Sequence, residues 1–271
     1  MIEIIKIILL GIVEGLTEFL PISSTGHLIV AASLLRPGFS EAAEDTFVLF
    51  IQFGAVVAVA LYYLRDLIAQ ARAFPSSSTV RRFWFGIVLA VIPAGLVGIL
   101  LRGFIKEVLF TPVVVATTLI LGGIVFILFE RSALASRPAQ DDMMQVTPRQ
   151  ALLIGVFQVA SLIPGVSRAA ASILGGMWIG LSREAAIRFS FFLAIPTLGG
   201  ATLVDFLLSL DEIGDANWGY FLLGAVVSGV MAWLSIGWLL KFVARNRFTP
   251  FGWYRIGAGL IILILVAIGV L

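Results

Sequence analysis

Glu14-Gly-Leu-Thr-Glu18-Phe-Leu-Pro-Ile-Ser-Ser-Thr-Gly-His27 interrupts an apolar run that extends from about residue 4 to residue 35. Pro21 and Gly26 break the helical pattern in the middle of this run, beside two carboxylates, several hydroxyl groups and the only histidine of the chain. At membrane depth, irregular backbone is tolerated only where it is buried in protein or lines a cavity. The stretch therefore predicts a broken, re-entrant helical hairpin.

The composition is typical of a polytopic membrane protein. Of the 271 residues, 60% are hydrophobic and 13% are charged, and the mean hydropathy is +1.09. The absence of cysteine excludes disulfides and zinc sites built on cysteine. The N-terminus has neither a basic n-region nor a small-residue cleavage site, so we expect no signal peptide. The basic residues form loop clusters rather than a surface interleaved with aromatics, which predicts no nucleic-acid partner.

Six further apolar segments are each long enough to cross a bilayer, which takes about 20 residues. They lie at about residues 45–64, 83–101, 112–130, 185–209, 218–240 and 251–271. A second interrupted run, from about 150 to 180, contains Pro164 and Gly165 in its middle and predicts a second hairpin. The expected fold is an all-α polytopic membrane protein with about six transmembrane helices and two broken re-entrant hairpins.

The two hairpins belong to a faint internal repeat. Gly11-Ile-Val-Glu14 aligns with Gly155-Val-Phe-Gln158, and Pro21-Ile-Ser-Ser24 aligns with Pro164-Gly-Val-Ser167. We expect a single integral membrane domain, residues 1–271, with repeat halves at approximately 1–131 and 145–271. Interrupted helices at corresponding places in two halves indicate a binding site near the bilayer midplane.

Basic residues gather in alternate loops, and the positive-inside rule places these loops in the cytoplasm. They are Arg65, Arg72, Arg81 and Arg82, then Arg131, Arg137 and Arg149, then Lys241, Arg245 and Arg247. Both termini then face outward, the first hairpin enters from outside and the second enters from the cytoplasm. The repeat is therefore expected to have inverted topology.

The first hairpin carries groups suited to an anion and a metal. Glu14 and Glu18 lie at i and i+4, so they share one helix face and repel unless a cation or a shared proton joins them. Each acidic residue at a helix centre costs about 2.5 to 3.5 kcal/mol in lipid. The helix after the break would begin among hydroxyl and glycine residues, and such an N-terminus is a ready anion site. The candidate phosphate-binding residues there are Ser23, Thr25 and Gly26, beside Ser24.

The second hairpin places one arginine, Arg168, among small residues. A guanidinium can bind a phosphate through two parallel hydrogen bonds. Gly165 and the alanines after Arg168 would let a ligand or the other hairpin approach the backbone closely. Ser167 and Ser172 can add hydroxyl donors.

Together the first stretch and Pro164-Gly-Val-Ser-Arg168 resemble the undecaprenyl pyrophosphate phosphatase family, also called the bacitracin resistance protein BacA. The resemblance implies hydrolysis of the C55 isoprenyl pyrophosphate to the monophosphate and inorganic phosphate, which recycles the lipid carrier of peptidoglycan synthesis and confers resistance to bacitracin. It also implies a divalent cation, Mg²⁺ or Ca²⁺, a lipid substrate, and a location in the bacterial inner membrane with the active site open to the periplasmic face. A homodimer is compatible with it.

Residue by residue, the resemblance implies catalytic roles for Glu14, Glu18, Ser24, His27 and Arg168, with the metal on Glu14 and Glu18. Ser167 takes the place of the family's phosphate-binding serine. Where family members follow the arginine with serine and, three residues later, threonine, this chain has Ala169 and Ser172. Position 169 therefore has no hydroxyl to donate to phosphate, whereas Ser172 retains one.

Several roles stay open at this point. We favour Ser24 as the nucleophile, activated by His27 or Glu18, because an unassisted hydroxyl is a poor nucleophile. Direct attack by His27 or by a metal-bound water is an alternative. Arg255 is expected to be an interhelical or interfacial partner rather than a catalyst. The competing class is a transporter or flippase of a lipid-linked phosphate or small anion, because inverted repeats with broken helices are a carrier architecture.

Overall fold

The computed structural model describes residues 2–38, 41–137, 139–208 and 218–271. The described residues are helical apart from turns and one isolated bridge between Gln140 and Leu181. This confirms the expected all-α class.

Six long helices occupy the positions predicted for the membrane spans. They are α3 (Glu41–Tyr62), α5 (Ser78–Leu100), α7 (Pro112–Arg131), α10 (Arg183–Leu208), α11 (Trp218–Val243) and α12 (Thr249–Ala267). Five of them are long and apolar enough to cross a membrane alone, and the sixth, α3, continues through a 64° bend into α4 (Leu64–Ala73). Short connecting helices are α6 (Arg102–Phe104), a π-helix (Ile105–Leu109) and 3₁₀ turns at Ala133–Ser136 and Met143–Gln145.

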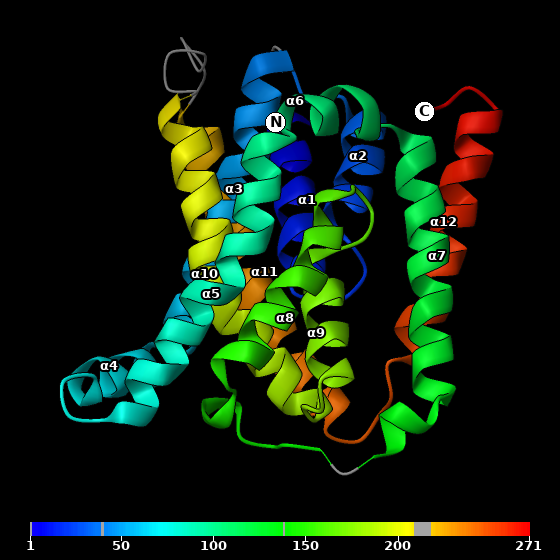
Figure 1. Ribbon diagram of the computed structural model, residues 1–271. Coiled ribbons are helices and arrows are strands. Elements are labelled where there is room, and N and C mark those ends of the chain that lie inside the picture. Colours follow the sequence, from blue (N-terminus) through cyan, green and yellow to red (C-terminus); the bar gives the residue numbers. More distant parts are fainter. Residues whose placement is uncertain (1, 39–40, 138, 209–217) are drawn as a thin grey trace.

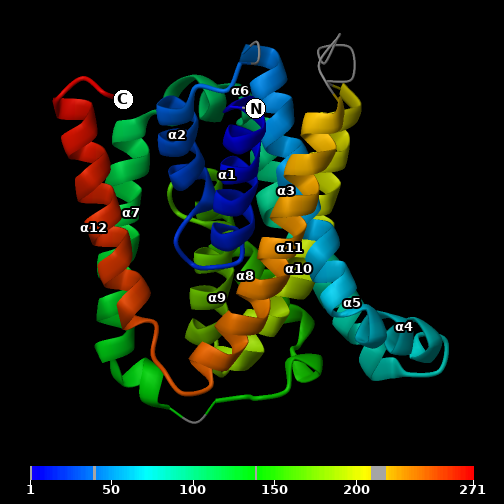
Figure 2. The ribbon, with the colours of Figure 1, turned by 180° about the vertical axis from the view of Figure 1, so that it is seen from behind.

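Both interrupted apolar runs form helical hairpins, as predicted. The first hairpin is α1 (Ile2–Thr17) and α2 (Ser24–Leu35), and the second is α8 (Pro148–Val159), a 3₁₀ turn (Ala160–Leu162) and α9 (Arg168–Trp178). In Figure 1 and in the reverse view of Figure 2, α1 and α2 start and end at one end of the molecule, whereas α8 and α9 start and end at the other. The turns of both hairpins therefore lie at mid-height. We call residues 18–23 the first tip and residues 160–167 the second tip.

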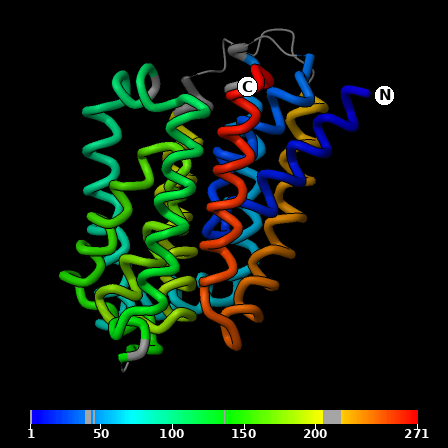
Figure 3. Tube along the Cα trace, turned by 90° about the vertical axis from the view of Figure 1, so that its right-hand side faces the viewer, coloured from blue at the N-terminus to red at the C-terminus, as the bar shows by residue number. Residues whose placement is uncertain are grey.

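The loops predicted to be basic all lie at one end of the molecule, and both chain termini lie at the other (Figures 1 and 3). The arrangement matches the alternation that the positive-inside rule requires. Which end faces the cytoplasm stays a prediction, because it rests on that rule alone.

Small residues let the helices approach closely around the first hairpin. A Cβ on Gly11 would lie 2.8 Å from the carbonyl oxygen of Gly224 on α11, and one on Gly15 would clash with the carbonyl oxygen of Ser228. Helices in lipid associate through such backbone contacts, because the apolar surroundings provide little hydrophobic driving force. The glycines of α1 thus seat it against α11 and fix the height of the first tip.

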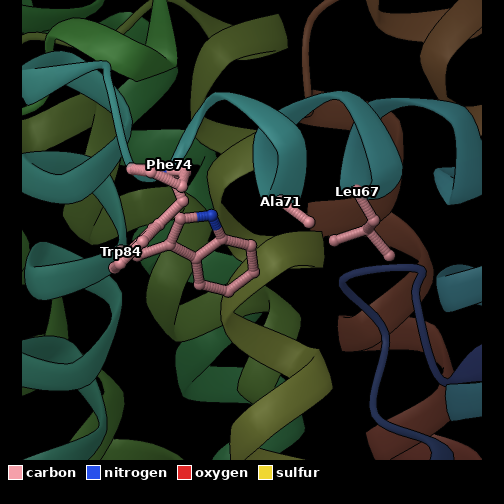
Figure 4. Close-up of a pocket in the computed structure, with 5 residues that line it drawn as sticks. Leu67, Ala71, Phe74 and Trp84 are labelled. Atoms are coloured by element: carbon pink, nitrogen blue, oxygen red, sulfur yellow. The ribbon is translucent and has the colours of Figure 1, made fainter.

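An ion pair joins three elements at the end of the molecule where the basic loops lie, which we call the basic end. Glu130, which is 2% exposed, accepts hydrogen bonds from the Arg183 guanidinium and, at 2.9 Å, from the backbone N–H of Phe248. It links α7, the start of α10 and the loop before α12. A pocket of about 450 Å³ lies at the junction of α4 and α5, and Figure 4 shows its apolar lining, Leu67, Ala71, Phe74, Pro75 and Trp84. That lining holds no group suited to phosphate chemistry.

Candidate active site at the two hairpin tips

An ion pair joins the two hairpins. Arg168 Nη2 donates to Glu18 Oε1 at 3.1 Å, and the two side chains are only 9% and 5% exposed. Their hairpins start and end at opposite ends of the molecule, and the two residues lie 150 positions apart in the sequence. The contact brings the two candidate residues together at the ends of the two hairpin tips.

The second oxygen of Glu18 binds a hydroxyl. Ser24 Oγ donates to Glu18 Oε2 at 2.6 Å, and both residues are buried. Ser24 is the first residue of α2, so its hydroxyl stands at the N-terminus of a helix. A carboxylate that accepts a hydrogen bond from a serine hydroxyl is placed to take its proton.

His27 makes different contacts. Its Nδ1 lies 2.7 Å from the Ser23 carbonyl oxygen, its Nε2 lies 2.7 Å from Tyr254 Oη, and the two rings stack. Since a carbonyl oxygen only accepts, Nδ1 carries the proton of a neutral imidazole and Nε2 accepts from the phenol. Of the two bases considered for Ser24, the geometry therefore favours Glu18. The sequence alone does not indicate Tyr254, on α12, as a site residue.

Arg168 is held by a hydroxyl pair as well as by Glu18. Its Nη1 donates to the Ser190 carbonyl oxygen at 3.0 Å and to Ser190 Oγ at 3.1 Å. Ser172 Oγ lies 2.7 Å from Ser190 Oγ and donates to the Arg168 carbonyl oxygen at 2.9 Å. Ser172 thus supports the arginine, and Ser190, on α10, joins the site without any sequence motif that could have indicated it.

The arginine also keeps a free donor. Its Nε is buried and has no hydrogen-bond partner among the described residues, and its guanidinium lies over the Phe19 ring at 5.5 Å. An unsatisfied buried donor costs about 1 to 3 kcal/mol. A phosphate oxygen is the kind of acceptor that would satisfy it.

The two tips end in equivalent serines. Ser23 and Ser167 have φ of 74° and 73°, and their hydroxyls cap α2 and α9 by accepting from Gly26 N–H at 3.4 Å and Ala170 N–H at 3.2 Å. Such conformations cost about 1 to 3 kcal/mol and cluster at functional sites. The correspondence corrects the sequence alignment by one residue, because Ser23 rather than Ser24 matches Ser167. The second tip has one more residue after its proline.

The other predicted phosphate-binding residues have varied surroundings. Thr25 is half-buried and Gly26 is buried, both in the first turn of α2. Gly165 has φ of 90°, and a Cβ there would lie 2.5 Å from the Val115 carbonyl oxygen, so this glycine packs the second tip against α7. Ala169 is fully buried in the apolar core. Position 169 therefore has a packing role.

Glu14 is the candidate metal ligand that the protein leaves unsatisfied. It is 1% exposed, and neither carboxylate oxygen has a hydrogen-bond partner in the described structure. Buried carboxylates normally pair or coordinate a metal. Glu14 and Glu18 therefore fit a divalent cation, although no group of three or more histidine or acidic residues suited to a metal occurs in the described ranges. Oxygens of a bound phosphate would have to complete the shell.

Comparison with known proteins identifies relatives along nearly the whole chain. The family model of the bacitracin resistance protein BacA matches residues 7–261. An undecaprenyl-diphosphatase of Deinococcus radiodurans is 48% identical over 265 residues, covering 96% of this chain and 94% of that protein. A protein with the same name from Acidovorax ebreus is 47% identical over 263 residues, covering 96% of this chain and 94% of that protein. Another from Lacticaseibacillus casei is 42% identical over 272 residues, covering 99% of this chain and 100% of that protein.

Proposed function

The chain belongs to the bacitracin resistance protein BacA family. We propose that its two hairpin tips together hydrolyse the lipid diphosphate on which this family acts. The activity is that of an undecaprenyl-diphosphatase, a membrane hydrolase that converts undecaprenyl diphosphate to the monophosphate and inorganic phosphate. The observation that carries the mechanism is the shared carboxylate of Glu18, which binds Ser24 on one oxygen and Arg168 on the other.

Arg168 binds the terminal phosphate. The diphosphate carries several negative charges, and transfer of a phosphoryl group requires that charge be neutralised as it moves to the leaving oxygen. The unpartnered Nε of Arg168 supports this role, as do the N-termini of α2 and α9 at the tips. The hydroxyl groups of Ser167, Ser23 and Thr25 provide further donors at those helix ends, whereas the single donor of Gly26, its N–H, already binds Ser23 Oγ.

Ser24 is the nucleophile and Glu18 is its general base. Ser24 Oγ attacks the terminal phosphorus, the bond to the bridging oxygen breaks, and undecaprenyl phosphate leaves. The serine proton passes through Glu18 to the leaving phosphate. In the second step Glu18 takes a proton from water, which attacks the phosphoserine, releases inorganic phosphate and restores the Ser24 hydroxyl. His27 is oriented by Ser23 and Tyr254 and supports α2 at the site.

A divalent cation, Mg²⁺ or Ca²⁺, would be held by Glu14 and Glu18 together with phosphate oxygens. When bound, it would neutralise charge on the diphosphate and relieve the repulsion between the two glutamates. The unsatisfied carboxylate of Glu14 supports this assignment. An ionised Glu14 needs such a cation, because burying a carboxylate without a partner is unfavourable.

The site opens toward the outer face of the bacterial inner membrane. The positive-inside rule supports this orientation, since it places the basic loops in the cytoplasm and the open ends of α1 and α2 outside. The isoprenyl tail needs no polar pocket and stays in the bilayer. A homodimer stays a prediction, because the mechanism needs only one copy of each tip.

The experiment that tests this function measures phosphate release from an isoprenyl diphosphate by the purified protein, with and without EDTA. Glu18→Gln and Arg168→Ala are each expected to lower kcat by about 10² to 10⁴-fold, the range of a general base or a charge-stabilising donor. Glu130→Gln is the matched control, because it removes another buried carboxylate paired with arginine, at the basic end. Equal losses in Glu130→Gln and Glu18→Gln would reject the assignment.

A further inference from the structure

Arg255 is the most deeply buried cation of the described chain, with an exposed fraction of 0%. It lies on α12, and all of its hydrogen bonds within the described residues go to main-chain carbonyl oxygens. Burying an ion costs several kcal/mol even after relaxation, and a carboxylate partner is the usual compensation. The role of this buried arginine therefore depends on which structural elements carry the carbonyl groups that it binds.

The carbonyl groups come from three elements. Arg255 Nη1 donates to the Pro21 oxygen in the first tip and to the Val166 oxygen in the second tip, both at 3.0 Å. Nη2 donates to the Gly165 oxygen at 2.9 Å. Weaker contacts, at 3.4 Å, reach the carbonyl oxygens of Thr118 and Leu119 on α7. One guanidinium thus binds both tips and the helix behind them.

These contacts lie next to the residues of the proposed mechanism. Pro21 precedes the cap Ser23 by two residues, and Val166 directly precedes the cap Ser167. A shift of either tip would change the distance between Glu18 and Arg168, which meet across the same gap. The guanidinium fork presents five N–H groups in a rigid plane, so it can hold several carbonyl groups at fixed separations.

The surroundings are shaped for this side chain. A Cβ on Gly122 of α7 would clash with Arg255 Nη2, so glycine leaves room for the guanidinium. The group also lies over the Phe126 ring at 6.0 Å, and Thr118 Oγ donates to the Pro164 oxygen at 2.6 Å, which fastens the second tip to α7 independently. A lysine has three donors on one point charge and could not reach both tips and α7 in this geometry.

We propose that Arg255 is a positioning residue, which fixes the separation of the two hairpin tips and through it the relative placement of Glu18, Ser24 and Arg168. It contacts no reacting group. The inference rests on the proposed function in one respect, namely that both tips act on the same diphosphate.

The test combines kinetics with a distance measurement. The chain has no cysteine, so spin labels can be attached at Leu16→Cys and Ile163→Cys, two positions 37% and 38% exposed beside the first and within the second tip. In Arg255→Gln we expect a broader label-to-label distance distribution and a fall in kcat of about 10²-fold, the effect of a misplacement near 1 Å. KM should change less than threefold, since the phosphate-binding groups remain. Arg255→Lys should recover part of the loss.

Arg183→Gln is the matched control, because it removes an arginine that binds Glu130 away from the tips. It should lower the melting temperature while leaving the label distances and kcat unchanged. Gly122→Ala displaces the Arg255 guanidinium by steric contact and leaves its positive charge in place. If Arg255→Gln does not fold, this variant tests the positioning role.

Unchanged distances and kcat in Arg255→Gln, or in Gly122→Ala, would overturn the proposal, as would equal changes in Arg183→Gln. The distance readout does not depend on turnover. Broadened distances in a protein that releases no phosphate even as wild type would refute the proposed function and leave the positioning role standing.

Discussion

Gln158 occupies the position in the second hairpin that Glu14 occupies in the first. Each lies nine positions before the cap serine of its tip, Ser167 and Ser23 respectively. Both are buried, at 2% and 1% exposure, and both have side-chain oxygens without a partner among the described residues. Only Glu14 has an ionisable side chain, and only Glu14 has a second acidic residue, Glu18, four positions later. The two hairpins are therefore alike in shape and unlike in their capacity for a cation.

We predict from this asymmetry that Glu14→Gln weakens cation binding and that Gln158→Leu does not. Mg²⁺ at 100 times its Kd should stabilise the wild type by about 2.7 kcal/mol, by mass action. The shift in melting temperature should shrink in Glu14→Gln and persist in Gln158→Leu. Because Glu14→Gln also removes a buried carboxyl group that has no partner and lies beside Glu18, the metal-free variant should melt no lower than the metal-free wild type. An undiminished Mg²⁺ shift in Glu14→Gln would remove Glu14 from the metal site.

A second prediction concerns the pair of Ser24 and Glu18. Residues that act as a unit give non-additive losses, so Ser24→Ala, Glu18→Gln and the double variant should lose similar factors in kcat. Tyr254→Phe, which leaves His27 Nε2 without its donor, should lower kcat less than tenfold, because it is outside that unit. The measurement is single-turnover phosphate release. Trapping of a phosphoenzyme should require Ser24, and trapping that survives Ser24→Ala would assign the nucleophile elsewhere.

A third prediction concerns the cap serines, whose hydroxyl groups stabilise a helix start while their positive φ costs conformational energy. Ser167→Ala removes the cap, which costs about 0.5 to 2 kcal/mol, and keeps a side chain at positive φ. Ser167→Gly also loses the hydroxyl but relieves the conformational cost. The glycine variant should therefore unfold at a higher temperature than the alanine variant, and the same order should hold at Ser23. If alanine were the more stable replacement at both positions, the backbone conformation would be costing nothing.

The long helices and the two hairpins could be predicted from the sequence because both signals are local. About 20 apolar residues make a span, and a proline beside polar residues interrupts one. The candidate site residues in and beside the tips could be proposed for the same reason, since Glu14, Glu18, Ser24 and Arg168 stand out against an apolar background. The one-residue error in the repeat came from matching Pro21 with Pro164, whereas the helix starts set the structural register.

The contacts that orient those residues were not predictable in the same way. Ser190 and Tyr254 lie on α10 and α12, far along the chain from the residues that they bind, and neither lies in a distinctive polar pattern. The sequence predicts Arg255 to be an interhelical or interfacial partner. In the structure it binds carbonyl groups of both tips from α12, which the sequence does not specify. Non-local contacts of this kind depend on how the spans pack, which a single sequence does not encode in any short motif.

The last prediction concerns Gly15, which lies on α1 between Glu14 and the first tip and faces α11. Its carbonyl oxygen accepts from Ser235 Oγ at 3.1 Å, and a Cβ would clash with the Ser228 carbonyl oxygen and come within 2.9 Å of the Ala232 nitrogen. Backbone atoms cannot move aside as a flexible side chain can, so Gly15→Ala must displace α1 from α11. Overpacking of this kind typically costs about 1 to 3 kcal/mol.

Glu14 and Glu18 lie on the same segment as Gly15. Displacement of α1 from α11 should therefore lower kcat as well as the melting temperature. Gly95→Ala, in the interior of α5, is the matched control, since a Cβ there meets nothing within 4 Å. It should leave kcat unchanged and leave stability within about 0.5 kcal/mol of the wild type, as for substitutions away from packed features. Thermal unfolding in detergent and phosphate release measure both effects on the same samples. A Gly15→Ala protein that matched Gly95→Ala in both would mean that α1 does not depend on close contact with α11 to hold its carboxylates at mid-height.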